Sequence, residues 1–249
     1  MESIAIETEC TDMCVLPNNQ ILSSNYNDKS LSLYDENFKQ IKKINKINDQ
    51  IFVSFNAACS DTAIYLSDSL NNQIVMLNFK LDFVKKVGSK GSEKHQFDQP
   101  WGITFRNDYL YVCDVKNKRV QILTNDLKFY KIFKLDFEAW FIKVTNHTIC
   151  LQLREPKCIH FYHLNTFKLL NKYDHGWRRI SEINSRFYEF DTATLNLHCY
   201  DENGDLIRSL ETGLNSAHKS YCSGYIFELK GDIYMILDKQ KRLLKFHVK

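Results

Sequence analysis

Tryptophan and arginine side chains form the combination in this sequence that could recognise another molecule. Trp101, Trp140 and Trp177 recur at regular intervals, and Arg178 and Arg179 directly follow the last of them. An indole can stack on a nucleobase or anchor a peptide side chain, which contributes about 1–3 kcal/mol when the ligand is desolvated. In a structural alternative, each tryptophan wedges two neighbouring elements together. The chemistry offered by these residues is binding.

Residues that could make or break bonds do not form a known constellation. None of the eight histidines belongs to a His-Glu-x-x-His pair, and the sequence lacks a Gly-x-Ser-x-Gly nucleophile motif. Cys10 and Cys14 have a spacing that could suit zinc, but no second ligand pair follows them. We therefore expect a protein that is not an enzyme and that carries no metal or other cofactor.

The composition is that of a globular protein. Of 249 residues, 44% are apolar and 25% are charged, which is enough to build a packed core. No charge-free stretch approaches the roughly 20 residues of a membrane-spanning helix. The acidic start at Met1-Glu2 differs from the basic start of a secretory signal, and the eight cysteines form no Cys-x-x-Cys pair. We expect a cytoplasmic location, reduced and mostly buried thiols, and no membrane partner.

A repeat organises the elements that must position these side chains. Residues 97–123 read as three short strands with polar turns between them, and 129–135 would supply a fourth. The second strand ends on an Asx residue in five units, at Asn25, Asp68, Asp114, Asp191 and Asp238, and a degraded copy lies near Leu153. Units in the forties with four strands each are typical of a propeller, and no unit shows a helical period.

The predicted fold class is all-β, a six-bladed β-propeller of four-stranded antiparallel blades in one domain over residues 1–249. The blades are expected at approximately 13–44, 51–88, 100–135, 138–173, 176–210, and 223–249 together with 3–8. The last unit stops one strand short, and 3–8 reads as a spare strand. We predict that this N-terminal strand completes the last blade and closes the ring, which removes unpaired edges.

The polar residues at the recurring turn have a structural interpretation. Asp114 and Asn117 recur in the preceding unit as Asp68 and Asn71. An Asx side chain accepts hydrogen bonds from main-chain N–H groups two residues on. Because a catalytic carboxylate is not needed once per blade, we expect these residues to cap turns.

The best-defined unit resembles a known repeat. The resemblance rests on Phe97, Pro100, Gly102, Ile103, Tyr111, Val112, Asp114, Asn117, Arg119, Val120 and Gln121. These residues look like the NHL repeat, which implies a six-bladed propeller. Such propellers often form the carboxy-terminal part of tripartite-motif ubiquitin ligases, where they bind RNA or protein. The sequence has no RING or B-box cysteine and histidine clusters, so the resemblance does not carry ligase activity to this chain.

The two sets of turns differ in charge. In a four-stranded meander, the turns after strands two and four lie at one end of the blade, and here they hold more lysine and arginine than acid. The opposite turns hold an excess of acid, although the total formal charge is only +3. A basic face would attract phosphates or an acidic partner, whereas the alternative is that the lysines are simply the solvated residues of loops.

These observations predict a non-enzymatic recognition module whose basic face binds a protein or single-stranded RNA, with no small-molecule substrate. The expected partner-binding residues are Lys116, Lys118, Arg119, Trp177, Arg178, Arg179, Trp101 and Trp140. A second possibility is the substrate-recognition part of a ubiquitin-ligase-type protein. A third is a propeller hydrolase or lyase with a metal in the central channel, for which Glu182, Glu228 and Asn56 are the polar residues on the innermost strands.

Overall fold

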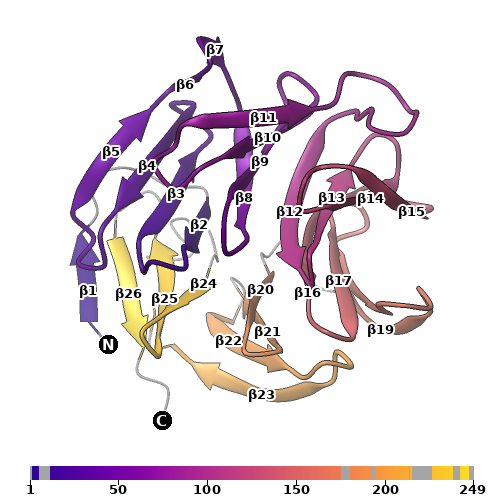
Figure 1. Cartoon of the computed structure of the whole chain (residues 1–249). Coiled ribbons are helices and arrows are strands. Elements are labelled where there is room, and N and C mark those ends of the chain that lie inside the picture. Colours follow the sequence, from indigo (N-terminus) through magenta and orange to yellow (C-terminus); the bar gives the residue numbers. More distant parts are fainter. Residues whose placement is uncertain are drawn as a thin grey trace. The chain divides into compact units, whose positions relative to one another are not determined.

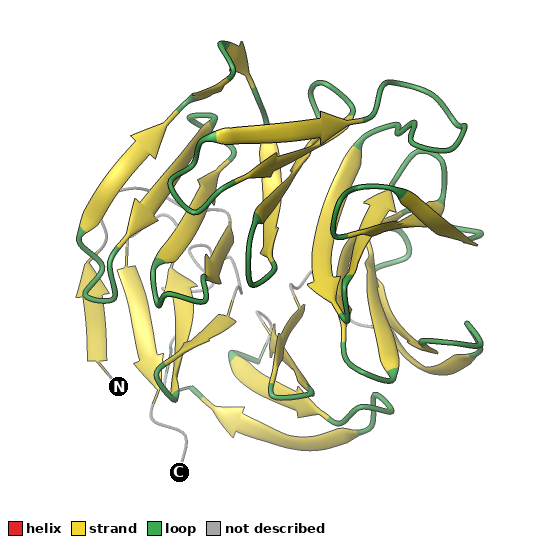
Figure 2. Ribbon diagram, in the orientation of Figure 1, coloured by secondary structure: helices red, strands yellow, loops and turns green. Residues whose placement is uncertain are grey.

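The computed structural model describes residues 2–5, 12–174, 180–191, 194–212, 214, 226–237 and 242–246. In these residues every regular element is a β-strand (Figure 2). The chain divides into two compact units, Thr11–Ile142 on the one hand and Met1–Cys10 with Lys143–Lys249 on the other. Each unit is described in turn below.

The unit Thr11–Ile142 contains three complete four-stranded antiparallel sheets, each with its strands in sequence order. The first comprises β2 (Asp12–Val15), β3 (Ile21–Asn25), β4 (Ser30–Tyr34) and β5 (Gln40–Ile44). The second comprises β8 (Ser54–Cys59), β9 (Ile64–Asp68), β10 (Gln73–Leu77) and β11 (Phe83–Val87). The third comprises β12 (Pro100–Arg106), β13 (Tyr109–Asp114), β14 (Arg119–Thr124) and β15 (Phe129–Lys134). A small hairpin of β6 (Lys46–Ile47) and β7 (Gln50–Ile51) follows the first sheet.

The remaining sheets follow the same order. The fourth sheet comprises β16 (Ala139–Val144), β17 (Thr148–Leu153), β18 (Cys158–His163) and β19 (Leu169–Asp174). The division between the two units falls within β16, after Ile142. The fifth comprises β20 (Ile180–Ile183), β21 (Arg186–Asp191), β22 (Asn196–Tyr200) and β23 (Leu206–Glu211). The sixth comprises β24 (Ile226–Leu229), β25 (Asp232–Leu237), β26 (Arg242–Phe246) and β1 (Glu2–Ala5).

The sixth sheet joins the two ends of the described chain. Strand β1 pairs antiparallel with β26, with Glu2 opposite Lys245 and Ala5 opposite Arg242. Figure 1 shows the indigo β1 beside the yellow β26. The N-terminal strand therefore supplies the outer strand of the last sheet, as the sequence predicts. Six four-stranded antiparallel sheets make the chain a six-bladed β-propeller, which confirms the predicted fold class.

Burial within a blade follows from the position of the strand. Every residue of the middle strands β3, β4 and β9 is buried. In the case of β9, the first and third sheets cover the two faces of its sheet. The outer strands β5 and β19 alternate exposed and half-buried side chains, because only one face is covered. In the Thr11–Ile142 unit the core lies between adjacent sheets, where Leu33 of β4 clusters with Leu66 of β9 and Val75 of β10.

The turns between third and fourth strands share a geometry that the sequence did not reveal. Phe38, Leu81 and Leu127 adopt positive φ in three of these turns, yet each side chain is at most 8% exposed. A left-handed conformation costs an L-residue roughly 1–2 kcal/mol. Burying a Leu or Phe side chain contributes about 1.5–3 kcal/mol, which offsets that cost. In each turn, the buried side chain packs into the core and stabilises the turn.

The same main-chain hydrogen bond closes the turns at Leu81 and Leu127. The Leu81 N–H donates to the Asn78 carbonyl at 3.0 Å, and the Leu127 N–H donates to the Thr124 carbonyl at 2.9 Å. The strand pairing shifts register just before each turn, between Met76 and Leu77 in the second sheet. This is the three-residue hairpin loop with a bulge at the left-handed position.

Candidate functional site

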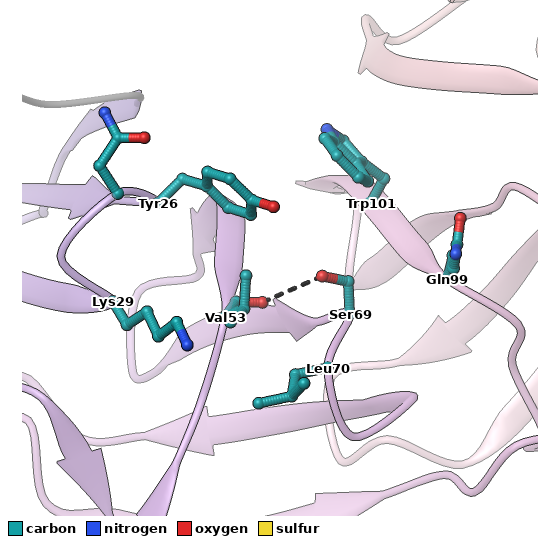
Figure 3. Close-up of a pocket in the computed structure, with 8 residues that line it drawn as sticks. Tyr26, Lys29, Val53, Ser69, Leu70, Gln99 and Trp101 are labelled. Atoms are coloured by element: carbon teal, nitrogen blue, oxygen red, sulfur yellow. Dashed lines mark hydrogen bonds between the residues drawn. The ribbon is translucent and has the colours of Figure 1, made fainter.

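A cavity of about 400 Å³ opens where turns of the first three blades meet, all within the Thr11–Ile142 unit. Its lining residues are Tyr26, Asn27 and Lys29 of the β3–β4 turn, Ser69 and Leu70 of the β9–β10 turn, Val53 ahead of β8, Gln99 ahead of β12, and Trp101 of β12. Figure 3 shows Tyr26 and Lys29 on one side of the cavity and Trp101 and Gln99 on the other. The cavity therefore lies at the turn ends that the sequence assigns to the basic face.

Two aromatic side chains, Tyr26 and Trp101, face each other across this pocket. The ring centroids of Tyr26 and Trp101 are 6.4 Å apart, and Trp101 meets the edge of Trp140 at 4.3 Å. Trp140 is buried, whereas Trp101 is half-buried and lines the cavity. Trp140 therefore supports Trp101 from behind, and Trp101 is the indole that a ligand can reach.

Close main-chain contact makes the edge contact between the indoles of Trp101 and Trp140 possible. A Cβ atom built on Gly102 would lie 2.6 Å from the Trp140 carbonyl oxygen and 2.7 Å from the Phe141 Cα. No real side chain fits in that space, so glycine allows β12 to approach β16 closely. The Trp101 carbonyl also accepts a hydrogen bond from the Ser67 hydroxyl of the neighbouring blade.

The recurring aspartates fix the walls of the pocket. The Asp68 carboxylate accepts hydrogen bonds from the Val53 N–H at 3.1 Å, the Asn71 side chain at 2.7 Å and the Gln73 side chain at 2.9 Å. Asp114 likewise accepts from the Asp98 N–H at 2.7 Å. The structure thus confirms that these residues cap turns, and it shows that they also hold the segments ahead of β8 and β12.

Gln99 on the rim of the pocket is held at both main-chain groups. Its N–H donates to the Asn72 side-chain oxygen at 2.8 Å, and its carbonyl accepts from the Val115 N–H at 3.4 Å. The neighbouring Asp98 carbonyl accepts from the Lys116 N–H at 3.1 Å. The β13–β14 turn is therefore continuous with the pocket rim.

Lys29 supplies the positive charge of the pocket. Its side chain is exposed, and it takes no part in the ion pairs found among the described residues. The adjacent Asp28 pairs with Lys43 at 2.7 Å and accepts from Ser30. Burial raises the pKa of Asp28, but the hydrogen bonds from Lys43 and Ser30 outweigh it and keep that pKa below its ordinary value. Asp28, the acidic residue next to Lys29 in the sequence, therefore forms its ion pair with Lys43.

The basic residues predicted for partner binding occupy different environments. Lys118 is exposed, and Lys116 is exposed but pairs with Glu138 at 2.9 Å. Arg119 turns inward, where its side chain is 9% exposed and its Nε donates to Asp114 at 2.7 Å. The Arg119 guanidinium also donates to the carbonyls of Ser92, Glu93 and Gln96. Arg119 therefore organises the β11–β12 connection from within.

Three of the predicted site residues cannot be placed. Trp177, Arg178 and Arg179 lie outside the described residues, so their role stays a sequence-based prediction. Tyr26, Lys29 and Leu70 were missed by the sequence analysis. Tyr26 and Leu70 are 41% and 52% exposed although each stands in a polar turn. The available signal was a bulky apolar residue one or two positions after the asparagine or aspartate that ends the second strand, as Tyr26 follows Asn25 and Leu70 follows Asp68.

The polar residues considered for a channel metal are engaged elsewhere. Asn56 is buried, donates to Asp12 of β2 and accepts from the Ile103 N–H of β12 at 3.1 Å. Glu182 accepts from the Ser185 N–H at 2.8 Å, and Glu228 accepts from Asn184 at 2.8 Å. No three metal-ligating side chains come together in the part of the chain that the structure describes. In that same part, no helix has the length and apolar character needed to cross a membrane.

Comparison with known proteins agrees with this architecture. Residues 97–123, which span β12 to most of β14, match the family model of the NHL repeat. The search of curated proteins gives no match.

Solved structures resemble the chain in fold at low sequence identity. The β-propeller domain of Cps50 (Swd1) from Myceliophteria thermophila is 10% identical, with a TM-score of 0.65 and full coverage of both chains. A catalytically inactive virginiamycin B lyase from Staphylococcus aureus with quinupristin is 12% identical, with a TM-score of 0.69 and coverage of 98% of this chain and 84% of that one. The WD40 domain of Neurospora crassa Pan2 is 9% identical, with a TM-score of 0.64 and coverage of 94% and 77%. The chain is thus a six-bladed β-propeller of four-stranded blades whose third blade matches the NHL repeat.

Proposed function

We propose that the chain is a non-enzymatic recognition module that binds a protein partner through the turn surface of its first three blades. We define this surface as the pocket residues Tyr26, Lys29, Leu70, Gln99 and Trp101 together with the exposed Lys116 and Lys118. The observation that carries the proposal is the cavity itself, in which exposed aromatic and aliphatic side chains stand on a rigid scaffold. Aromatic anchors in such pockets supply most of the energy of many protein interfaces.

The charges of this surface favour a protein over RNA. Of its three lysines, Lys116 pairs with Glu138 at 2.9 Å, so only Lys29 and Lys118 are exposed cations outside the ion pairs of the described residues. RNA affinity depends on many cations that are free to replace counterions along the phosphates. The aliphatic Val53 and Leu70 in the lining also suit a peptide side chain better than a stacked base.

The pocket lining favours binding over catalysis. None of its residues is histidine, cysteine, aspartate or glutamate. The Ser69 hydroxyl donates to the Val53 carbonyl at 3.3 Å (Figure 3), so its proton is directed to the main chain and not to a base. A nucleophilic serine needs a base within hydrogen-bond reach. The likeness to a lyase propeller is one of fold.

Affinity capture from native lysate with a matched pair of variants tests the proposal. Leu70→Asp places a charge in the pocket, and Leu206→Asp makes the same change at a residue of similar exposure on β23, 52% against 49%. We expect proteins recovered by the wild type and by Leu206→Asp to be absent with Leu70→Asp, before and after ribonuclease treatment. Circular dichroism confirms that both variants are folded.

Two results would decide against a protein partner on this surface. Identical protein recovery by Leu70→Asp and the wild type would remove the pocket from recognition. Loss of all captured material after ribonuclease treatment, with binding that weakens steeply as salt rises, would identify RNA as the partner.

A further inference from the structure

We infer that the pocket selects a peptide segment in which an apolar side chain stands next to a carboxylate. This inference rests on the proposed function and names the chemistry of the partner. Two observations on the pocket carry it: an apolar floor and wall, and one cation without a described partner.

The apolar part of the pocket suits one bulky side chain. Val53, Leu70, Tyr26 and Trp101 contribute carbon surface around a cavity of about 400 Å³. In Figure 3 the Tyr26 ring and the Trp101 indole stand on either side of this space, with Leu70 below. A leucine, isoleucine or phenylalanine side chain inserted here would be desolvated against aliphatic and aromatic groups, as anchor residues are at interfaces.

The positive charge of Lys29 favours an anionic group in the ligand. Lys29 lines the cavity, and its amine extends towards the centre of the pocket in Figure 3. The two acids of the adjacent turns are already used, since Asp28 pairs with Lys43 and the buried Asp68 holds its own turn. A carboxylate entering beside Lys29 would therefore meet a cation that no described acid competes for.

A single lysine matches a carboxylate better than a phosphate. Phosphate recognition normally combines several cations or main-chain N–H groups, or the bidentate guanidinium of arginine. Arg119, which begins β14 after the adjoining turn, is buried and bonded to Asp114 and to the main chain. The residues that could reach an anion in the pocket thus provide one point charge.

Polar groups on the rim suit the main chain of an extended peptide. Gln99 is exposed, and its own main-chain groups are fixed by Asn72 and Val115, so its side-chain amide is presented from a rigid position. A side-chain amide can both donate to and accept from a peptide group. Preorganised rim groups reduce the entropy lost on binding.

Selection from a random-peptide display library tests this inference directly. The bait proteins are the wild type, Lys29→Glu, Leu70→Asp and the control Lys39→Glu, an exposed lysine in the β4–β5 turn of the same sheet. We expect the wild type and Lys39→Glu to enrich peptides with Asp or Glu beside Leu, Ile or Phe. Lys29→Glu should enrich Lys or Arg in place of the acid, and Leu70→Asp should enrich neither.

Anisotropy titration of one enriched, fluorescein-labelled peptide then gives the magnitude. Replacing its acidic residue with the amide should weaken binding to the wild type about three- to tenfold, with no further change for Lys29→Glu. The inference would be overturned if acidic peptides bound Lys29→Glu with the same affinity as the wild type. Peptides without an acid that are lost with Leu70→Asp would overturn it too, while leaving the proposed protein-binding function in place. Peptides insensitive to every pocket variant would contradict both.

Discussion

One residue position shows how the same turn can be held by different chemistry. Position 119 is arginine in the third blade and its counterpart, Gln73, is glutamine in the second, yet both donate to the aspartate that ends the preceding strand. The arginine reaches further and binds three main-chain carbonyls of the β11–β12 connection. Residue type alone suggested a surface cation at 119, because the sequence does not reveal which side chain fits beneath a loop.

Removing the Arg119 guanidinium should destabilise the third blade. Arg119→Ala leaves the buried Asp114 carboxylate without its ion pair, which should lower the free energy of unfolding by about 3–5 kcal/mol. Arg119→Gln copies the second blade and should recover part of this loss. Urea unfolding followed by tryptophan fluorescence measures both variants. Equal stability of Arg119→Ala and the wild type would show that the network contributes nothing.

At the scale of strands, the contact between β12 and β16 depends on one missing side chain. Gly102→Ala would push a Cβ into the main chain at Trp140 and Phe141, so we expect a loss of about 1–3 kcal/mol. Gly231→Asn is the matched control, because Gly231 has open space around it and asparagine tolerates its positive φ. Thermal unfolding should separate the two. A control as unstable as Gly102→Ala would refute the steric explanation.

The N-terminal strand should contribute far more stability than a frayed end. Deleting residues 1–9 removes the four residues of β1 that pair with β26. The edge of β26 beside the buried Leu243 and Leu244 is then uncovered. Cross-strand pairs are worth roughly 0.2–1 kcal/mol each, so about 1–4 kcal/mol should be lost. Adding the deleted segment as a free peptide should restore part of the melting temperature. Identical melting of the truncated and full chains would count against this contribution.

For the whole molecule, the buried thiols predict how stability depends on pH. Burial raises the pKa of Cys113 and Cys150, so both thiols stay protonated in the folded state. In the unfolded chain they ionise near the ordinary value of about 8.5. The contribution of these two thiols to the free energy of unfolding should therefore be constant below that pH, and it should fall as pH rises above it.

Alkylation with iodoacetamide checks the thiol prediction by mass spectrometry. The half-buried Cys14 and Cys59 should react in the native state, and Cys113 and Cys150 only after urea is added. Native labelling of Cys113 at the rate of Cys14 would contradict the burial argument.

The fold was predictable from sequence because its signals are local. The Asx residue that ends the second strand in five of the six predicted units and the strand pattern around it lie within a few residues, and they recur. The pocket was not predictable, because Tyr26, Leu70 and Trp101 come from three different blades and meet only through packing. Phe38 and Leu127 were hidden for a related reason, since a buried anchor inside a polar turn has the local pattern of a loop.

The anchored hairpins also determine where the molecule could accept foreign sequence. Lengthening the loops at Phe38, Leu81 or Leu127 would withdraw a core side chain along with the loop, so an epitope tag spliced there would disturb the blade. The β24–β25 hairpin at Lys230 and Gly231 is exposed and has no such anchor. Exposed loop tips of this kind tolerate insertion, which makes this hairpin the natural place for a spectroscopic label or a fused reporter.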